Sequence, residues 1–362
     1  MKKNKIIIII SVIILAIILS LVFVKFKTAK PNPLKNWTLK QKVGQLMIVN
    51  FNGTEPDYYI NKMILERNVG GVILMGANIK DNDQIKTLTN ALQYNTTINE
   101  KQIPLFISID QEGGIVTRLQ DVEHTAEKDI KTEEQAIKVA KTRGEQLLSL
   151  GININLAPVL DFSTDKNSFI YSRTFENNLA ETSKLAVATA KGYNQAKIIY
   201  VPKHFPGHFN SVIDSHQELP MILESEKEML NNTKPFQEVI NNQDPKIIMT
   251  SHTLYPKIDP KYPATLSKKI LTDILRKKLK YNGLIMTDDL SMKALTKKYT
   301  LEEIAIKALQ ASNDILLFIG EPEEQVNVYN AIIKAVEDKK ISEKEIDEKV
   351  IKILELKNQM QE

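Results

Sequence analysis

The chain of 362 residues has no cysteine and a single tryptophan. Without cysteine it can form no disulfide bond, no thiolate metal site and no cysteine nucleophile, and it cannot carry a lipid on an N-terminal cysteine. The lack of thiols also suits a protein that works outside the cytoplasm, where free thiols are oxidised.

The chain also has no large excess of positive or negative charge. The 48 basic and 44 acidic residues leave a formal net charge of +4, and aromatic residues make up only 6% of the chain. Nucleic-acid-binding domains concentrate basic residues, often with aromatic residues, on one face. We therefore expect no nucleic-acid partner. The length and the 43% of hydrophobic residues allow one large domain or two small ones.

The long hydrophobic run of the chain lies at its N-terminus. After a basic start at residues 1–5, which we expect in the cytoplasm, residues 6–24 contain no charge, proline or glycine. As a helix, about 19 residues span roughly 28 Å, close to the hydrocarbon thickness of a bilayer. The next segment offers no small-residue cleavage site, so we favour a transmembrane anchor over a cleaved signal peptide, which stays the alternative. Residues 25–36 are then a tether and residues 37–362 a domain outside the membrane.

Eight short hydrophobic, β-rich runs follow the tether, and most are separated by stretches with helical periodicity, such as 133–150, 179–196 and 267–279. Runs that are hydrophobic throughout indicate strands buried on both faces. Strand–helix units of this number predict an α/β fold, a (β/α)8 TIM-like barrel, preceded by the N-terminal transmembrane helix. An open doubly wound sheet is the alternative, but no phosphate-binding glycine loop follows the first run. The eight runs are residues 43–51, 70–75, 104–109, 152–158, 198–203, 246–250, 283–287 and 314–319.

Polar residues gather where these runs end. Asp110 follows the third run, Asp161 the fourth, His252 the sixth and Asp288 the seventh. In a parallel barrel the carboxyl ends of the strands meet at one rim, and that rim carries the active site. We therefore expect these residues to face one another.

The fifth run leads into residues 203–216, which hold three of the five histidines of the chain together with a lysine and an aspartate. Asp214 lies two residues before His216, so its carboxylate can orient the imidazole and raise its affinity for a proton. Glycoside hydrolysis needs one carboxylate that attacks the sugar and one group that protonates the leaving oxygen. Asp288 and His216 can supply these two functions.

A metal site is the alternative use of the histidines. His204 and His208 are four residues apart and could bind a metal together with Asp214 and His216. The Pro-Gly pair between them interrupts the helix on which an i, i+4 pair of ligands would lie. We therefore expect neither a metal nor a cofactor, and we expect His208 to structure its loop.

Three motifs resemble those of glycoside hydrolase family 3, and within it the bacterial β-N-acetylglucosaminidase (β-N-acetylhexosaminidase) branch that trims cell-wall fragments. Residues 109–114 with Arg118 resemble (I/V)DQEGGxVxR, residues 203–216 resemble KHFPGHG-x4-DSH, and residues 286–292 resemble (S/T)DDLxM. With weaker matches between them, the motifs cover most of residues 38–320. The second motif is highly specific.

The resemblance implies a retaining exo-β-N-acetylglucosaminidase that releases terminal N-acetylglucosamine from peptidoglycan fragments. Asp288 matches the family nucleophile, His216 its acid/base and Asp214 the partner of that histidine. A further set matches residues that hold the sugar hydroxyls: Asp110, Arg118, Arg173, Lys203 and His204. The expected partners are a β-linked N-acetylglucosaminide or muropeptide substrate and, through the N-terminal helix, the bacterial cell membrane. The chain resembles the single-domain form of the family, in which the whole site lies in the barrel. We also expect a monomeric catalytic domain.

Phe209 is a departure, because the family motif has glycine at this position. Glycine permits backbone angles that phenylalanine resists. One interpretation is a reshaped loop, with the ring covering the sugar, and another is an impaired loop, which would make the protein a weakly active or non-catalytic glycan-binding relative. The third is that the change is silent. A further alternative is phosphorolysis, because a histidine acid would not repel an incoming phosphate as a carboxylate would.

Other polar residues near the expected rim have plainer interpretations. We expect Asp289 to fix its loop beside the nucleophile and Glu112 to support the rim. His252 is either rim packing or a substrate contact.

Overall fold

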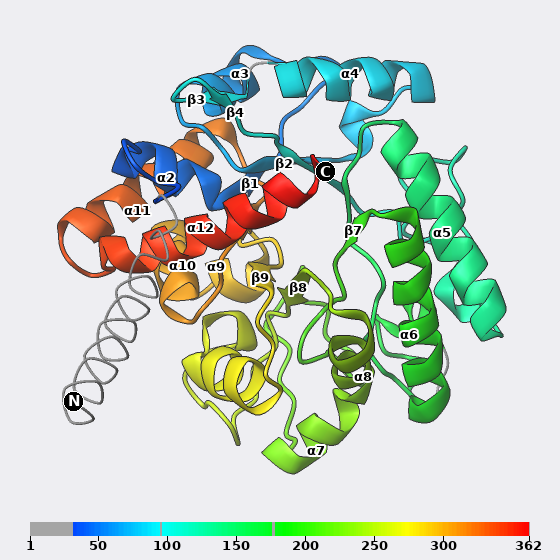
Figure 1. The fold of residues 1–362 in the computed structure, drawn as a ribbon. Helices are drawn as coiled ribbons and strands as arrows, with labels where there is room; N and C mark the ends of the chain where they lie inside the picture. The colour runs from blue at the N-terminus through cyan, green and yellow to red at the C-terminus, as the bar shows by residue number, and fades with distance from the viewer. Residues whose placement is uncertain (1–31, 95, 176–177, 362) are drawn as a thin grey trace, which may run out of the picture. The chain divides into compact units, whose positions relative to one another are not determined.

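A computed structural model describes residues 32–94, 96–175 and 178–361 (Figure 1). Thr38–Glu362 is one compact unit. The predicted anchor at residues 6–24 lies outside the described residues. No helix of the described part is both long enough and hydrophobic enough to cross a bilayer.

Each of the eight predicted runs contains a strand, and these strands are parallel to one another. They are entirely buried, which explains why their sequences are hydrophobic throughout instead of alternating. The strands are β1 (Met47–Val49), β2 (Gly71–Leu74), β5 (Phe106–Ile109), β6 (Ile154–Asn155), β7 (Ile199–Tyr200), β8 (Ile247–Thr250), β9 (Leu284–Thr287) and β10 (Leu316–Phe318).

The strands neighbour one another in chain order. Six form a sheet in the order β10-β1-β2-β5-β6-β7, and β8 pairs with β9. A parallel bridge between Phe205 and Thr250 joins the chain after β7 to β8, and one between Met286 and Ile315 joins β9 to the chain before β10. The result is an α/β fold with a parallel sheet, which is consistent with the predicted TIM-like barrel.

Helices follow most strands and lie around the sheet (Figure 1). The predicted helices at 133–150 and 179–196 are confirmed as α5 and α6. The predicted helix at 267–279 is a π-helix, Lys269–Lys278, after which the Leu279 N–H donates to the carbonyl of Ile274, five residues back (2.8 Å). The α-helices are α2 (Leu39–Gln45), α3 (Tyr58–Leu65), α4 (Asn82–Tyr94), α5 (Glu133–Ser149), α6 (Leu179–Ala196), α7 (Glu226–Asn232), α8 (Lys234–Gln243), α9 (Lys293–Thr296), α10 (Leu301–Gln310), α11 (Pro322–Glu337) and α12 (Glu343–Gln359).

Helices α5 and α6 lie side by side because glycines let them approach closely (Figure 1). A Cβ at Gly144 would lie 2.7 Å from the Cβ of Ala196, and one at Gly192 would lie 2.5 Å from the carbonyl oxygen of Ile137. Any larger side chain would push the two helices apart. This pair supports β6 and β7, whose carboxyl ends lead to Asp161 and Lys203.

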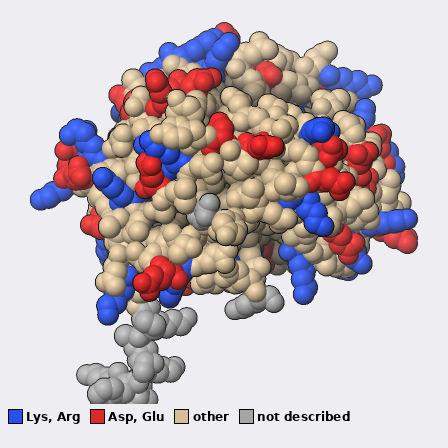
Figure 2. Space-filling model, turned by 90° about the horizontal axis from the view of Figure 1, so that it is seen from above, with Lys and Arg blue, Asp and Glu red and all other residues tan. Residues whose placement is uncertain are grey.

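Two features lie outside the strand–helix repeat. A short antiparallel hairpin, β3 (Thr97–Ile98) and β4 (Lys101–Gln102), precedes β5 and was not predicted from the sequence, because its mostly exposed residues form no hydrophobic run. Charged residues of both signs are interspersed on the face in Figure 2, in agreement with the mixed charge of the sequence.

Candidate active site

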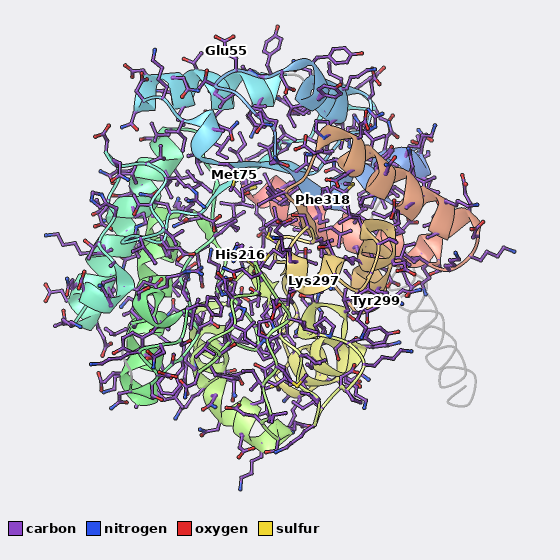
Figure 3. The ribbon with its side chains drawn as sticks, turned by 180° about the vertical axis from the view of Figure 1, so that it is seen from behind. Glu55, Met75, His216, Lys297, Tyr299 and Phe318 are labelled. Carbon is purple, nitrogen blue, oxygen red and sulfur yellow. The ribbon has the colours of Figure 1, made fainter. Side chains whose placement is uncertain are left out.

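A cavity of about 320 Å3 lies at the carboxyl ends of the strands. Its walls come from the ends of β2, β5, β6, β7, β8, β9 and β10 and from the loops that follow them. His216 lies centrally on this face (Figure 3). The predicted site residues that line the cavity are Asp110, Arg118, Arg173, Lys203, His204, His216 and Asp288. Asp214 does not line it but is hydrogen-bonded to His216.

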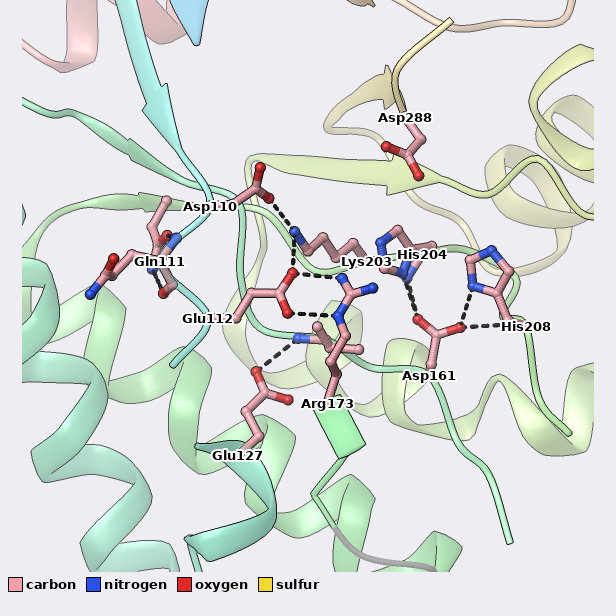
Figure 4. A network of polar contacts seen from close by, with 12 residues as sticks. Asp110, Gln111, Glu112, Glu127, Asp161, Arg173, Lys203, His204, His208 and Asp288 are labelled. Atoms are coloured by element: carbon pink, nitrogen blue, oxygen red, sulfur yellow. Dashed lines mark hydrogen bonds and ion pairs between the residues drawn. The ribbon is translucent and has the colours of Figure 1, made fainter. Parts of the chain in front are cut away.

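Glu112 holds two cationic side chains of the cavity wall (Figure 4). Its Oε1 lies 2.7 Å from Nζ of Lys203, and its two oxygens accept from Nε and Nη2 of Arg173 at 2.8 and 2.6 Å. Burial raises the pKa of Glu112, but Arg173 and Lys203 outweigh burial and lower the pKa to about 2. Lys203 also donates to Asp110 at 2.5 Å. Glu112 therefore supports the rim, as expected from the sequence, by fixing two residues that line the cavity.

Replacing Glu112 with glutamine should reduce the free energy of unfolding by about 3 kcal/mol, because removing one partner of a buried ion pair leaves charge uncompensated. The change can be measured by urea denaturation. The control is Glu181→Gln, which removes an exposed pair with Lys184 (2.8 Å) and should leave the free energy of unfolding nearly unchanged, because solvent screens exposed charges. Equal effects of the two substitutions would contradict this role for Glu112.

Asp161 orients His204 and His208 in the wall of the cavity (Figure 4). Its two oxygens lie 2.7 Å from Nδ1 of His204 and 3.0 Å from Nδ1 of His208, and both backbone N–H groups also donate to it. Burial raises the pKa of Asp161, but the two histidines outweigh burial and hold the pKa well below its usual range. A carboxylate only accepts, so each Nδ1 carries the proton and each Nε2 is an acceptor in the neutral ring. Among the described residues, Nε2 of His208 has no partner.

The same three residues could hold a metal ion by the proximity of their donor atoms, which lie within 4.8 Å of one another. The Nδ1 atoms of His204 and His208 already face Asp161. The rings could therefore bind a metal only through their Nε2 atoms. The hydrogen bonds to Asp161 hold the imidazoles of His204 and His208 in place without a metal. That the protein needs none stays a prediction.

Asp288 follows β9 and presents an ionised carboxylate to the cavity. Its backbone N–H donates to the carbonyl of Thr250 at 3.2 Å, and its Oδ1 accepts from the backbone N–H of Asp289 at 2.8 Å. Burial raises its pKa, but His204, His252, that N–H and Lys203 outweigh burial and lower the pKa to about 2. Figure 4 shows the carboxylate on the side of the cavity to which His204 and His208 belong. Asp288 can therefore act as a nucleophile at neutral pH.

Asp289 fixes the loop after β9. Its carboxylate accepts from the backbone N–H groups of Ser291 (3.0 Å) and Ile319 (2.8 Å), while its carbonyl oxygen accepts from Nε2 of His252 (2.8 Å). His252 is fully buried and does not line the cavity. The geometry therefore favours the packing interpretation of His252.

His216 and Asp214 form a dyad on the loop that follows β7. The Nδ1 and the backbone N–H of His216 lie 2.7 and 2.9 Å from Oδ1 of Asp214. Burial raises the pKa of Asp214, but these two groups of His216 outweigh burial and lower it. Because Nδ1 faces the carboxylate, Nε2 is the atom free to exchange a proton with a ligand. The His216 side chain is 65% exposed.

Phe209 does not cover the cavity, so the expectation that its ring lies over the sugar is wrong. Its side chain is 4% exposed, is absent from the cavity wall, and packs edge-to-face on Tyr255 with ring centroids 6.2 Å apart. Its φ of 45° lies in the left-handed region, where the family has glycine. The hydroxyl of Ser168 donates to its carbonyl at 3.1 Å. The buried ring thus offsets the unfavourable backbone angle.

Replacing Phe209 with glycine should lower the free energy of unfolding by about 2–4 kcal/mol and leave turnover within a few-fold. Loss of a buried phenylalanine ring costs about 3–5 kcal/mol, and relief of the left-handed angle returns about 1 kcal/mol. Thermal unfolding and steady-state kinetics measure both effects. Phe169→Ala should instead reduce turnover more than Phe209→Gly does, because Phe169 lines the cavity. Lost activity with unchanged stability in Phe209→Gly would overturn this account.

Some residues of the site were not found from the sequence. Met75, Val116 and Phe169 line the cavity: Met75 ends a predicted run and Val116 lies within the first motif, but neither was given a role, and Phe169 is in no motif. Glu127 is a buried carboxyl group beneath Glu112 that accepts from the backbone N–H of Val159 at 2.9 Å (Figure 4). Burial raises the pKa of Glu127 well above its usual range. Nothing in the sequence around Glu127 distinguishes it from a surface glutamate.

An ionised carboxylate and an imidazole–carboxylate dyad associated with one cavity are groups that can hydrolyse a glycosidic bond. The sequence model of the family described as "Glycosyl hydrolase family 3 N terminal domain" matches residues 38–356. The chain therefore belongs to this family of glycoside hydrolases.

Curated relatives include beta-hexosaminidase A of Pseudoalteromonas piscicida, 32% identical over 330 residues, which are 83% of this chain and 55% of that protein. Beta-hexosaminidase of Idiomarina loihiensis is 33% identical over 305 residues, 82% of this chain and 89% of that protein. The chain thus spans about half of the first relative and most of the second.

Solved structures show the same relationship. A family 3 beta-N-acetylglucosaminidase from Paenibacillus sp. superposes with a TM-score of 0.84 at 36% identity, covering 89% of this chain and 62% of that chain. Beta-N-acetylhexosaminidase from Beutenbergia cavernae superposes with a TM-score of 0.82 at 26% identity, covering 89% of this chain and 98% of that chain.

Proposed function

We propose that this protein is a retaining exo-β-N-acetylglucosaminidase that acts on peptidoglycan fragments. The observation that carries the proposal is that Asp288 and His216 line one cavity, with Asp214 bonded to the histidine. The beta-hexosaminidase and beta-N-acetylglucosaminidase names of the relatives support it. A small cavity surrounded by charged and polar groups suits one terminal sugar.

In the first step of the proposed mechanism, a carboxylate oxygen of Asp288 attacks the anomeric carbon. The bond to the leaving oxygen breaks as Nε2 of His216 gives it a proton. In the second step water gives a proton to Nε2 of His216 and attacks the anomeric carbon, and the Asp288 carboxylate is released. Asp214 accepts from Nδ1 throughout and stabilises the charged imidazole.

The remaining wall of the cavity holds the sugar. Nε of Arg118 is buried without a hydrogen-bond partner among the described residues, so it is available to a hydroxyl group. Asp110 and Nε2 of His204 offer acceptors, and Lys203 and Arg173 offer donors held in place by Glu112. Donors and acceptors on several sides of one cavity match the many hydroxyls of a sugar.

We further propose that residues 6–24 anchor the enzyme in a bacterial cell membrane with residues 37–362 outside. The hydrophobic length of this run and the lack of cysteine support that location. Detergent-free fractionation of cells would place the full chain with the membranes. A soluble, shortened form in the medium would instead show cleavage of a signal peptide.

The test of the activity is hydrolysis of a chromogenic β-N-acetylglucosaminide, with a β-glucoside as the control substrate. Proton NMR of the first product should show the β anomer, because a covalent intermediate retains configuration. Release of the α anomer, or no hydrolysis, would overturn the proposal. Addition of phosphate distinguishes hydrolysis from phosphorolysis, which would give a sugar phosphate.

A further inference from the structure

A second cavity, of about 310 Å3, lies between the segment that follows β8 and helix α10. It does not overlap the wall of the active-site cavity. Its lining contains four lysines and one acidic residue, which contrasts with the mixed charges elsewhere (Figure 2). The lining residues are Asp259, Lys261, Tyr262, Leu266, Lys268, Lys269, Lys307, Gln310 and Ala311.

Tyrosine rings, rather than carboxylates, lie beside the ammonium groups of two lysines of this lysine pocket, Lys261 and Lys307, whereas Lys269 donates to the carbonyl of Ile258 (3.2 Å). The Nζ of Lys307 lies 5.2 Å from the ring centroid of Tyr262 and 5.8 Å from that of Tyr299. Lys261 lies 5.1 Å from the centroid of Tyr262, and Lys298 lies 5.3 Å from that of Tyr299. Cation–π contacts of this kind position a charge without neutralising it.

The acidic residue of the lining forms no ion pair with the four lysines, and its single charge leaves an excess of positive charge. The carboxylate of Asp259 accepts from the hydroxyl of Ser267 (2.7 Å) and from the backbone N–H groups of Lys261 (3.0 Å) and Tyr262 (3.2 Å). None of the four lysines of the lining forms an ion pair with a carboxylate of the described residues. Hydrogen bonding to Lys261 lowers the pKa of the Tyr262 phenol, and together with the charges of Lys307 and Lys261 it outweighs burial, which raises that pKa. The pocket is therefore electropositive.

A series of residue contacts runs from the loop of the catalytic dyad to the lysine pocket, and its last step is the hydroxyl of Tyr299, which donates to the carbonyl of Lys261 (3.4 Å). Glu218, two residues after His216, forms an ion pair with Lys297 (3.0 Å), and Tyr299 follows two residues later. Figure 3 shows Lys297 and Tyr299 beyond His216 on this face. In the proposed mechanism His216 protonates the leaving group, so its side of the cavity is where the leaving group extends.

We propose that the lysine pocket binds an anionic group, a carboxylate or phosphate, carried by the leaving-group part of the substrate. This inference rests on the proposed function. The tyrosine faces are covered by ammonium groups, so the pocket offers positive charge instead of a platform for a neutral sugar. An acidic peptide attached to the leaving sugar fits this chemistry.

The experiment compares two muropeptides of the same size that each carry a terminal N-acetylglucosamine. One has free peptide carboxylates and the other has these groups amidated. The wild type should have a KM about 3- to 10-fold lower for the acidic form at low salt, with similar kcat, and added salt should reduce the difference. Lys307→Gln and Lys261→Gln should each bring the two KM values together. Lys344→Gln, a charge-matched change at an exposed position of α12, should preserve the preference.

Equal KM values in the wild type, or a preference that survives in Lys307→Gln, would overturn the proposal. The pocket would instead serve free phosphate if phosphate raised the Tm of the wild type but not of Lys307→Gln, without any substrate preference. Loss of binding to anionic lipid vesicles in that variant, again without a substrate preference, would assign the pocket to a membrane surface and equally overturn the proposal.

A small neutral substrate separates this test from that of the proposed function. Hydrolysis of the chromogenic β-N-acetylglucosaminide should be the same in the wild type and Lys307→Gln, because its leaving group carries no peptide. If the wild type does not hydrolyse it, the proposed function fails. The pocket is then tested by calorimetric Kd values for the two muropeptides, where equal affinities would reject it.

Discussion

Replacing Asp288 with alanine should lower kcat for a β-N-acetylglucosaminide by at least about 10³-fold, because loss of a covalent nucleophile removes the two-step route. The pKa of Asp288 is lowered to about 2, so the carboxylate is ionised at any pH above about 4. A fall in wild-type activity between pH 4 and 7 therefore belongs to another group. Steady-state kinetics with a chromogenic substrate measures the loss.

The neighbouring Asp289 provides the matched control for this substitution. Its carboxylate accepts from backbone N–H groups of Ser291 and Ile319, so Asp289→Asn should disturb the loop and cost about tenfold. Both variants should still bind N-acetylglucosamine, because Lys203 and Arg173 remain held by Glu112. If Asp289→Asn lost more activity than Asp288→Ala, the nucleophile would have been assigned to the wrong carboxylate.

The strand positions could be predicted from the sequence because burial on both faces leaves uninterrupted hydrophobic runs. Each of the eight runs contains a strand, although β6 and β7 have only two residues each. The hairpin of β3 and β4 could not be predicted, because three of its four strand residues are exposed and form no hydrophobic run. The anchor at residues 6–24 remains a prediction, since it lies outside the described residues.

The site residues that belong to sequence motifs could be predicted. Contacts that depend on tertiary packing could not. Seven of the eight predicted site residues line one cavity, and the eighth, Asp214, is bonded to His216. The bonding of Asp161 to both His204 and His208 is a tertiary contact that no spacing indicates. Phe209 shows the limit most clearly. Its departure from the motif suggested a role over the sugar, whereas the ring is buried against Tyr255.

Replacing His216 with alanine should have an effect that depends on the leaving group. A sugar alkoxide needs a proton as it departs, so kcat/KM for a disaccharide should fall by about 10²- to 10⁴-fold. A dinitrophenolate is stable without a proton, and formation of the glycosyl intermediate from that substrate should change little. The second step still needs a base, so a burst of dinitrophenol should precede a slow steady state. Stopped-flow absorbance measures both phases.

Asp214→Asn is the control for the His216 substitution, because it keeps the imidazole but removes the charge that Nδ1 faces at 2.7 Å. Its loss should be smaller than that of His216→Ala and should show the same dependence on the leaving group. An equal loss for the disaccharide and the dinitrophenyl substrate in His216→Ala would show that His216 positions the sugar rather than transferring a proton. The exposure of the imidazole argues against a positioning role, because a 65% exposed side chain is poorly held unless a ligand covers it. Proton transfer needs only that Nε2 reach the leaving oxygen once the substrate is bound, which an exposed residue on a loop can do.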